Sequence, residues 1–186
     1  MRMGRKAGLG LGRRLLSSLA ARLSPRRGRR VVMTNEQIAR RFARMAALME
    51  LRGEDRFRAR AYRNAAEAIE TWPAPVERMA REGGAKALQD IPGVGKAISV
   101  KIVELIERGT FEAWERLTAE TPETVLDLLE VEGVGPKTAA ALHQRFKICT
   151  LEELRLFAEG GGLELLDNVN ERNAERIRRS LKRLAK

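Results

Sequence analysis

Two short glycine-containing segments carry the residues of this chain that are best suited to binding an anion. They are residues 91–95, which read Ile-Pro-Gly-Val-Gly, and residues 131–135, which read Val-Glu-Gly-Val-Gly. Glycine permits a positive φ and the close approach of a partner. A helix is predicted directly after each segment, and the first N–H groups of a helix have no partner within it. Together with the helix dipole, such groups favour an anion such as phosphate.

The residues beside these segments fit the same chemistry. Lys96 and Lys137 stand near the predicted helix N-termini, and Pro136 suits a first helical turn because no N–H partner is missed there. The central valines are expected to turn inward and anchor each turn. The residues that we predict to bind phosphate in the two segments are Gly93, Val94, Gly95, Lys96, Gly133, Val134, Gly135 and Lys137. Phosphate contacts carry no sequence information, so we expect salt-sensitive DNA binding that does not read bases.

The helices that must position these segments show one repeated pattern. A small residue follows the second glycine by four positions, Ser99 in one copy and Ala139 in the other, and should let two helices cross closely. A third copy begins at residues 166–170, Leu-Asp-Asn-Val-Asn, with Ala174 as its small residue. Recurrence of the unit is a better signal than any single copy. Asparagine tolerates the left-handed region but hinders close approach, so we interpret the third copy as structural.

The first half of the chain also predicts helices. Residues 34–37 fit a capping box, and apolar residues recur at helical spacing after it: Ile38, Phe42, Met45 and Met49. Gly53 should end that helix, and Asp55 should cap the next one. The second apolar stripe is predicted to consist of Phe57, Ala61, Ala65 and Ile69.

Further along, Trp72-Pro73 should stop the second helix, residues 75–81 read as a short helix, and Gly83-Gly84 reads as a break. Thr150 begins another capping box. No stretch alternates long enough to predict a strand, so we predict an all-α protein.

Charge is distributed unevenly along the 186 residues. The chain has 36 Lys and Arg against 25 Asp and Glu, a formal net charge of +11. Residues 1–33 hold ten of the basic residues and no acidic one, which leaves 26 basic and 25 acidic residues in 34–186. DNA affinity of the remainder must therefore come from local arrangement. The Arg-rich start is interpreted as a disordered basic tail, as sequence upstream of a true start at Met33, or as an organelle transit peptide.

The sequence lacks the residues that several kinds of site or segment require. Cys149 and His143 are the only cysteine and histidine, which excludes an internal disulfide and the usual zinc ligand sets. No run of about 18 apolar residues would span a membrane. The aspartates are far apart, whereas two-metal nucleotidyl transfer needs closely placed carboxylates. We expect no polymerase chemistry from this chain alone.

Residues 34–186 resemble the N-terminal part of bacterial family X DNA polymerases. Three blocks carry the resemblance in order and spacing: Phe57 to Ala66 (FRARAYRNAA), Ile91 to Lys96 and Gly133 to Lys137. The resemblance stops before any palm domain, so we expect a stand-alone relative or a fragment. It implies a small helical lyase-type domain with the first hairpin over 34–118 and a second helix-hairpin-helix region with a degenerate third hairpin over 119–186. The composition of residues 1–33 predicts a basic, disordered leader before them.

The resemblance also implies roles for individual residues. The family acts in gap filling and base-excision repair, and its small domain binds the 5′-phosphate at a gap. By position, Tyr62 supports that phosphate pocket, and the basic residues expected to line it are Arg58, Arg60 and Arg63. Arg58 stands where the family has a phosphate-binding lysine, and arginine can hold phosphate too. The hairpins of the family commonly hold a monovalent cation through backbone carbonyls, which implies Na⁺ or K⁺ here and no other cofactor.

In lyase-active members of the family, a lysine after the first hairpin attacks the abasic sugar aldehyde. By position this residue is Lys101. The Schiff-base chemistry needs a neutral amine, and the family lysine expected two positions after Gly95 is replaced by Ala97. The alternative is a solvated lysine that pairs with Glu104.

Three functions remain open from the sequence. The first is a DNA-binding module for gapped, nicked or duplex DNA, with a separate repair polymerase or nuclease as a further partner. The second is a 5′-deoxyribose-phosphate lyase, and the third is a helical protein-interaction module. We expect a cytoplasmic protein at the nucleoid, with organelle targeting through the Arg-rich leader as the alternative.

Overall fold

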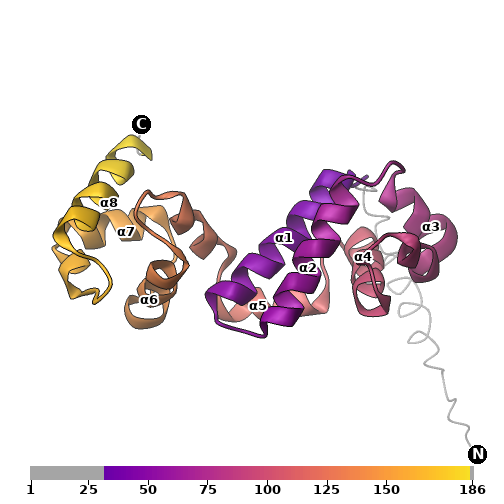
Figure 1. The fold of residues 1–186 in the computed structure, drawn as a ribbon, viewed down its shortest axis with the longest axis horizontal. Coiled ribbons are helices and arrows are strands. Elements are labelled where there is room, and N and C mark those ends of the chain that lie inside the picture. Colours follow the sequence, from indigo (N-terminus) through magenta and orange to yellow (C-terminus); the bar gives the residue numbers. More distant parts are fainter. Residues whose placement is uncertain (1–31, 185–186) are drawn as a thin grey trace, which may run out of the picture. The chain divides into compact units, whose positions relative to one another are not determined.

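The computed structural model describes residues 32–184 of the chain, and this part is built from helices without a β-strand (Figure 1). The predicted all-α fold is confirmed. The leader predicted over 1–33 lies almost wholly outside the described residues. In chain order the elements are α1 (Asn35–Leu51), α2 (Arg56–Glu70), α3 (Val76–Ala87), η2 (Leu88–Asp90), α4 (Lys96–Arg108), α5 (Glu112–Glu120), η3 (Glu123–Glu130), α6 (Pro136–Phe146), α7 (Leu151–Glu159), η4 (Gly162–Leu165) and α8 (Glu171–Leu184). Within residues 32–184, no helix is both long enough and apolar enough to cross a bilayer.

The pair α1 and α2 forms the centre of the first half, and the two helices lie side by side (Figure 1). α1 begins with the predicted capping box, in which the Thr34 hydroxyl accepts from the Gln37 N–H and the Gln37 side chain accepts from the Thr34 N–H. The predicted apolar stripe of α1 is buried throughout. Phe42 of this stripe stacks on Phe111, with ring centroids 5.3 Å apart, so α1 also meets the segment before α5.

The buried face of α2 differs from the predicted one. Asp55 caps the helix as expected and accepts from the Phe57 N–H at 2.8 Å. However, the Phe57 side chain is 87% exposed and Ala61 is exposed as well. The residues that face the core are Ala59, Tyr62, Ala65, Ala66 and Ile69. The physical reason is an aromatic contact: the Tyr62 ring lies 5.9 Å from that of Phe42, which rotates the buried face away from the first turn.

The linker after α2 is held over the start of α1 by a side chain. Nδ2 of Asn35 donates to the carbonyl groups of Trp72 and Ala74 at 3.0 Å, and its Oδ1 accepts from the Val76 N–H at 2.8 Å. α3 then continues past the predicted break, but Gly84 interrupts it with φ 61° and ψ −158°. The predicted break is thus a kink inside one helical element.

In the second half, α7 packs against α8, η3 and η4, and α6 packs against η3. α7 begins at the predicted capping box of Thr150, and Leu154 and Ala158 of this helix are buried. The rings of Phe146 and Phe157 lie 4.7 Å apart and join the end of α6 to α7.

Arg44 of α1 and Arg52, the residue at its C-cap, contact the segment between the two halves. Arg44 forms ion pairs with Glu123 and Asp127 of η3. Arg52 bonds Glu120 at 2.5 Å and the Thr121 hydroxyl at 3.2 Å. The contacts of Arg44 hold η3, which leads directly into the second glycine segment.

Candidate nucleic-acid interface

The two glycine segments fold into the same tight turn. In the first, the Val94 N–H donates to the Ile91 carbonyl at 3.0 Å, and in the second the Val134 N–H donates to the Val131 carbonyl at 2.9 Å. Gly93 and Gly133 occupy the third position of their turns with φ of 81° and 98°. A turn of this type requires positive φ at that position, which explains the glycines.

Each turn passes into a helix through an equivalent hydrogen bond to a glycine N-cap. Gly95 is the N-cap of α4 and Gly135 is the N-cap of α6, where Pro136 takes the first helical position as predicted. The predicted small residues, Ser99 and Ala139, are fully buried, and the N–H of each donates to the N-cap carbonyl at 2.9 Å. Their small size permits the tight helix crossing that fixes the turn.

The first amides of both helices are exposed and have no partner among the described residues. In α4 these are the N–H groups of Gly95, Lys96 and Ala97, and in the second hairpin those of Gly135 and Lys137. A Cβ built on Gly95 or Gly135 would meet nothing within 4 Å, so space for a ligand lies beside each N-cap. These groups are arranged to donate to an anion.

The valines of the turns contribute differently from the prediction. Val94 and Val134 are buried, with 3% and 5% exposure, and their N–H groups are used inside the turns. The exposed amides therefore begin at the second glycine of each segment. The valines anchor the turns from within, which is the inward orientation expected for their side chains.

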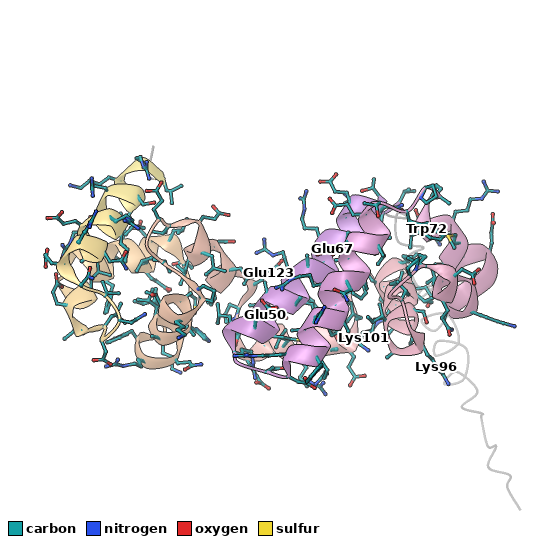
Figure 2. All side chains as sticks on the ribbon, in the orientation of Figure 1. Glu50, Glu67, Trp72, Lys96, Lys101 and Glu123 are labelled. Carbon is teal, nitrogen blue, oxygen red and sulfur yellow. The ribbon has the colours of Figure 1, made fainter. Side chains whose placement is uncertain are left out.

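Two lysines add charge at these helix starts. Lys96 and Lys137 are exposed, and neither forms an ion pair within residues 32–184. Figure 2 shows Lys96 at the beginning of α4. Because no carboxylate offsets them, both lysines can face a phosphate that accepts from the neighbouring amides.

The basic residues predicted to bind phosphate on α2 differ in whether a carboxylate already pairs with them. A Cβ on Gly93 would lie 3.7 Å from Asn64, so α2 supports the first turn directly. Arg60, one turn before Asn64 on the same face, is exposed and forms no ion pair in the described part of the chain. Arg63 bonds Glu50 at 2.5 Å, so its charge is already offset.

Tyr62 and Arg58 lie together at the base of this region. Tyr62 is only 5% exposed, and burial raises the pKa of its hydroxyl, while the charges of Arg58 and Arg116 act in the opposite direction. Arg58 also lines a small hollow of about 60 Å³ with Arg52, Arg116 and Glu120. The predicted pocket tyrosine is thus mainly a core residue whose surroundings are basic.

Lys101 lies on α4, further along the helix than Lys96 (Figure 2). Its side chain is half-buried, and Nζ donates to the Ala97 carbonyl at 3.0 Å. The alternative pairing with Glu104 is not observed, because Glu104 accepts from the Glu112 N–H at 3.3 Å instead. The buried face of α4 lies elsewhere on the helix and consists of Ile98, Ser99, Ile102, Leu105 and Ile106.

The third copy forms the same backbone hydrogen bonds as the two glycine hairpins, although its turn has no glycine and no positive φ. The Val169 N–H donates to the Leu166 carbonyl at 3.0 Å, and the Ala174 N–H donates to the Asn170 carbonyl at 2.9 Å. Asn168 does not adopt the positive φ that we considered for it. Its Nδ2 donates to the Thr138 hydroxyl at 2.8 Å, which joins this turn to α6. This contact supports a structural role for Asn168.

The sequence did not reveal that α8 packs against the second turn. Nδ2 of Asn173 donates to the Gly133 carbonyl at 3.0 Å, and the buried Ser180 hydroxyl accepts from the Glu132 N–H at 2.9 Å. A Cβ on Gly133 would lie 2.6 Å from Oδ1 of Asn173 and 3.0 Å from Cγ1 of Ile177. The spacing of Asn173, Ile177 and Ser180 places them on one helical face, which was the available signal.

Metal-binding side chains are not grouped in the described residues. No cluster of three or more His, Cys, Asp or Glu residues is found in the range 32–184. Sγ of Cys149 lies 3.4 Å from Nδ1 of His143 at the end of α6. The carbonyl oxygens of Val94 and Val134 accept no hydrogen bond from the described residues, so each turn keeps an oxygen donor of the kind that Na⁺ or K⁺ binds.

Comparisons with known proteins agree with this geometry. Residues 33–111 match a helix-hairpin-helix domain, and residues 125–183 match a SAM-like helix-hairpin-helix tandem. The chain is 28% identical over 149 residues to the DNA polymerase/3′-5′ exonuclease PolX of Bacillus subtilis, which covers 80% of this chain and 25% of that protein. It is 31% identical over 144 residues to DNA polymerase lambda of Arabidopsis thaliana, covering 74% of this chain and 26% of that protein. The chain thus spans about a quarter of the length of these relatives.

Proposed function

Because this chain has two helix-hairpin-helix regions and, as predicted, resembles the family X DNA polymerases, we propose that it binds the sugar-phosphate backbone of DNA without reading bases. The proposal includes a preference for gapped or nicked duplex and a role in DNA repair. The observation that carries it is the pair of identical turns that present unpartnered amides beside an unpaired lysine.

The geometry of the turns supports a phosphate ligand rather than a base. Main-chain N–H groups at a helix N-terminus donate to anions, and all bases carry the same phosphate. Donors that read base edges are side chains aimed into a groove, such as a bidentate arginine or asparagine. The groups at Gly95–Ala97 and Gly135–Lys137 are mostly backbone amides, so we expect similar affinity for different sequences.

The presence of two turns supports binding at a break in a strand. Each turn can hold one short stretch of backbone, and two such sites in one chain suit a duplex that is interrupted between them. Arg60 adds a charge beside the first turn only, because its helix supports Gly93. The relatives named as polymerases favour a place in repair synthesis, with this chain contributing the binding of the DNA.

The sharpest test compares two contributions of residue 96 to DNA affinity, that of its main-chain N–H and that of its side-chain charge. Lys96→Gln removes the charge of the side chain, whereas Lys96→Pro removes both the charge and the N–H. Proline is tolerated there because it occupies the first helical position, as Pro136 does in α6, and because Gly95 has φ −80° and ψ 176°, which suit the residue before proline. The affinity of the full chain for gapped, nicked and intact duplexes of several sequences is measured against salt concentration.

We expect both variants to bind more weakly than the parent, with Lys96→Pro weaker than Lys96→Gln by a further factor of roughly 3 to 10, which corresponds to the loss of about one ordinary hydrogen bond. The control Arg40→Gln removes a charge that already faces Glu36 at 2.5 Å on α1. Equal affinity of the two Lys96 variants, or affinity that follows base sequence, would remove the hairpin mechanism.

Lys101 carries a second candidate function, 5′-deoxyribose-phosphate lyase. The observation in its favour is that Nζ has no carboxylate partner in the described residues and is held on the same helix as the first hairpin amides. Borohydride reduction with an abasic substrate should then trap a covalent adduct that Lys101→Ala abolishes and Lys86→Ala keeps. An adduct that persists in Lys101→Ala takes the lyase role away from this residue.

Na⁺ or K⁺ at the hairpin carbonyls is a further part of the proposal. The unpartnered oxygens of Val94 and Val134 would contribute to such a site, and the bound cation would attract a phosphate oxygen to the turn. DNA affinity at constant ionic strength should then differ between K⁺ and tetramethylammonium salts.

A further inference from the structure

α8 carries a row of arginines that neither the hairpins nor the core uses. Arg172, Arg176, Arg179 and Arg183 follow one another at intervals of four, three and four residues, so they form one narrow stripe along the helix. All four are exposed, while the opposite face buries Ala174, Ile177 and Leu181. At 1.5 Å per residue, the row extends for roughly 16 Å along the helix axis.

The charge of this row is poorly offset by the protein itself. Arg172, Arg176 and Arg179 have no ion pair within residues 32–184, and only Arg183 has one, with Glu132 at 2.8 Å. Elsewhere on α8, Arg178 is fully engaged by Glu164 and Glu171. Arg179 hydrogen-bonds only a backbone carbonyl, that of Glu175. Arg178 thus lies on one flank of the helix, and the three arginines without an ion pair in the described residues lie on the other flank.

The contacts of α8 fix which way the row lies. Asn173 and Ser180 hold the helix against residues 132–133 of the second turn, and the arginine row lies on the flank next to these contacts. Arg183 reaches Glu132 from this flank. An open groove of about 580 Å³ is lined here by Glu132, Arg176, Arg179, Lys182 and Arg183. The row is thus continuous with the surface of the second hairpin.

Arg172 occupies the position in the third copy of the motif that Lys137 occupies in the second. It stands two residues after Asn170, as Lys137 stands two residues after Gly135. The third turn keeps the backbone bonds of the other two, and the N–H groups of Glu171 and Arg172 donate to nothing within the described residues. The third copy has lost its glycines and still presents a cation at the start of its helix.

We infer that the arginine row of α8 is a further binding surface for DNA backbone phosphates, separate from the two glycine hairpins and continuous with the second one. This inference rests on the proposed DNA binding and assigns a function to the copy of the motif that lacks glycine. Guanidinium groups form bidentate bonds with phosphate, and a row of this length matches the backbone of about five base pairs at 3.4 Å each. The surface would lengthen the footprint of the second hairpin along the duplex.

The test uses the full chain and a triple variant, Arg172→Gln, Arg176→Gln and Arg179→Gln. The control triple, Arg40→Gln, Arg78→Gln and Arg108→Gln, loses the same formal charge from arginines that already face carboxylates. Affinity for a labelled duplex of mixed sequence is measured over a range of salt concentrations. Each lost phosphate contact should lower the salt slope by about 0.9, so the α8 triple should lose about 2 to 3 and bind roughly 30- to 100-fold more weakly at physiological salt.

Comparing slopes within the full chain cancels the contribution of residues 1–33, which every variant shares. The control triple should keep the parent slope, and Arg→Lys at the three α8 positions should keep most of it, which excludes misfolding as the cause. If the α8 triple variant keeps the salt slope of the parent for DNA, the inference is wrong. This holds even if the same variant loses affinity for an acidic polypeptide such as polyglutamate, because the row would then bind acidic protein rather than DNA. If the Lys96 variants lose DNA affinity and the α8 triple variant does not, the hairpins bind DNA and the arginine row does not. If only the α8 triple variant loses affinity, the arginine row binds DNA and the hairpin proposal is wrong.

Discussion

The first and second hairpins share a backbone but differ in what supports them. The turn at Gly93 rests on α2, where Asn64 would be 3.7 Å from an added Cβ. The turn at Gly133 is held by α8, where Oδ1 of Asn173 would be 2.6 Å away. The first glycine is therefore required by its dihedral angles, and the second by its angles and by the lack of space. The same motif therefore requires glycine for different physical reasons in the two hairpins.

The hairpins also differ in how much they offer to a ligand. The first helix begins with Lys96, which brings an N–H and a charge, whereas the second begins with Pro136, which brings neither. Arg60 lies near the first turn, and the arginine row of α8 lies near the second. The first hairpin is thus richer in amides, and the second has a more extended basic surface beside it.

The largest effect is expected from alanine at Gly93 and Gly133, the positive-φ glycines of the two hairpin turns. Gly133→Ala should destabilise the chain by about 2 to 4 kcal/mol, because strained backbone and a steric clash add, whereas Gly93→Ala should cost about 1 to 2 kcal/mol from strain alone. Urea unfolding followed by circular dichroism measures both. Gly95→Ala is the control, since Gly95 has φ −80° and open space around it.

The double variant Gly133→Ala with Asn173→Ala sharpens this comparison. Removing the Asn173 amide relieves the clash, so the two changes should couple by more than about 0.5 kcal/mol. Equal destabilisation by Gly93→Ala and Gly133→Ala would show that α8 does not constrain the second turn.

A smaller effect is expected from making the second hairpin more like the first. Pro136→Lys restores an N–H and adds a charge at the first helical position of α6. DNA affinity should rise by roughly 3- to 10-fold at physiological salt, and the salt slope should steepen by up to about 0.9. Pro136→Gln, which restores only the N–H, is the matched control. If Pro136→Lys binds no better than the parent, the second hairpin does not contact phosphate.

The smallest effect concerns Tyr62 on α2, the helix that supports the first turn. Burial raises the pKa of this hydroxyl above its ordinary value of about 10, so the unfolded chain ionises at a lower pH than the folded one. The stability linked to Tyr62 is complete below pH about 10 and is lost as the pH rises toward the folded pKa. Tyr62→Phe should therefore lose less stability between neutral and strongly alkaline pH than the parent does.

The chain contains one tyrosine, so the ultraviolet absorbance of tyrosinate reports Tyr62 alone. Its titration midpoint should lie above 10 in the folded chain and return to about 10 in urea. A midpoint at the ordinary value in the folded protein would contradict the burial of Tyr62.

Much of the fold follows from the sequence because its signals are local. The capping boxes at Thr34 and Thr150, the glycines of the two hairpins and the small residues after them act over three or four positions. Hydrogen bonds at this range depend on neighbouring residues and on dihedral angles that glycine alone adopts easily. The all-α class and the exposed amides at Gly95 and Gly135 were predictable for this reason.

The candidate site was only partly predictable from the sequence, because the fold decides which basic side chains lie next to a carboxylate and which do not. The sequence placed Arg60 and Arg63 on the same helix, but Glu50 of α1 offsets the charge of Arg63 alone. It placed Phe57 in a buried stripe, whereas the contact of Tyr62 with Phe42 turned the buried face away from it.

What the sequence by itself determined is the turn: its glycines, its internal hydrogen bond and the helix that starts beyond it. What only the tertiary structure decided is the environment of each turn, namely α2 behind Gly93, α8 against Gly133 and a row of arginines of which only Arg183 has a carboxylate partner in the described residues. Turn geometry is set by the dihedral energies of a few adjacent residues. Steric crowding and charge pairing depend on contacts between residues up to 83 positions apart, such as Arg44 with Asp127, and these form only when the helices pack.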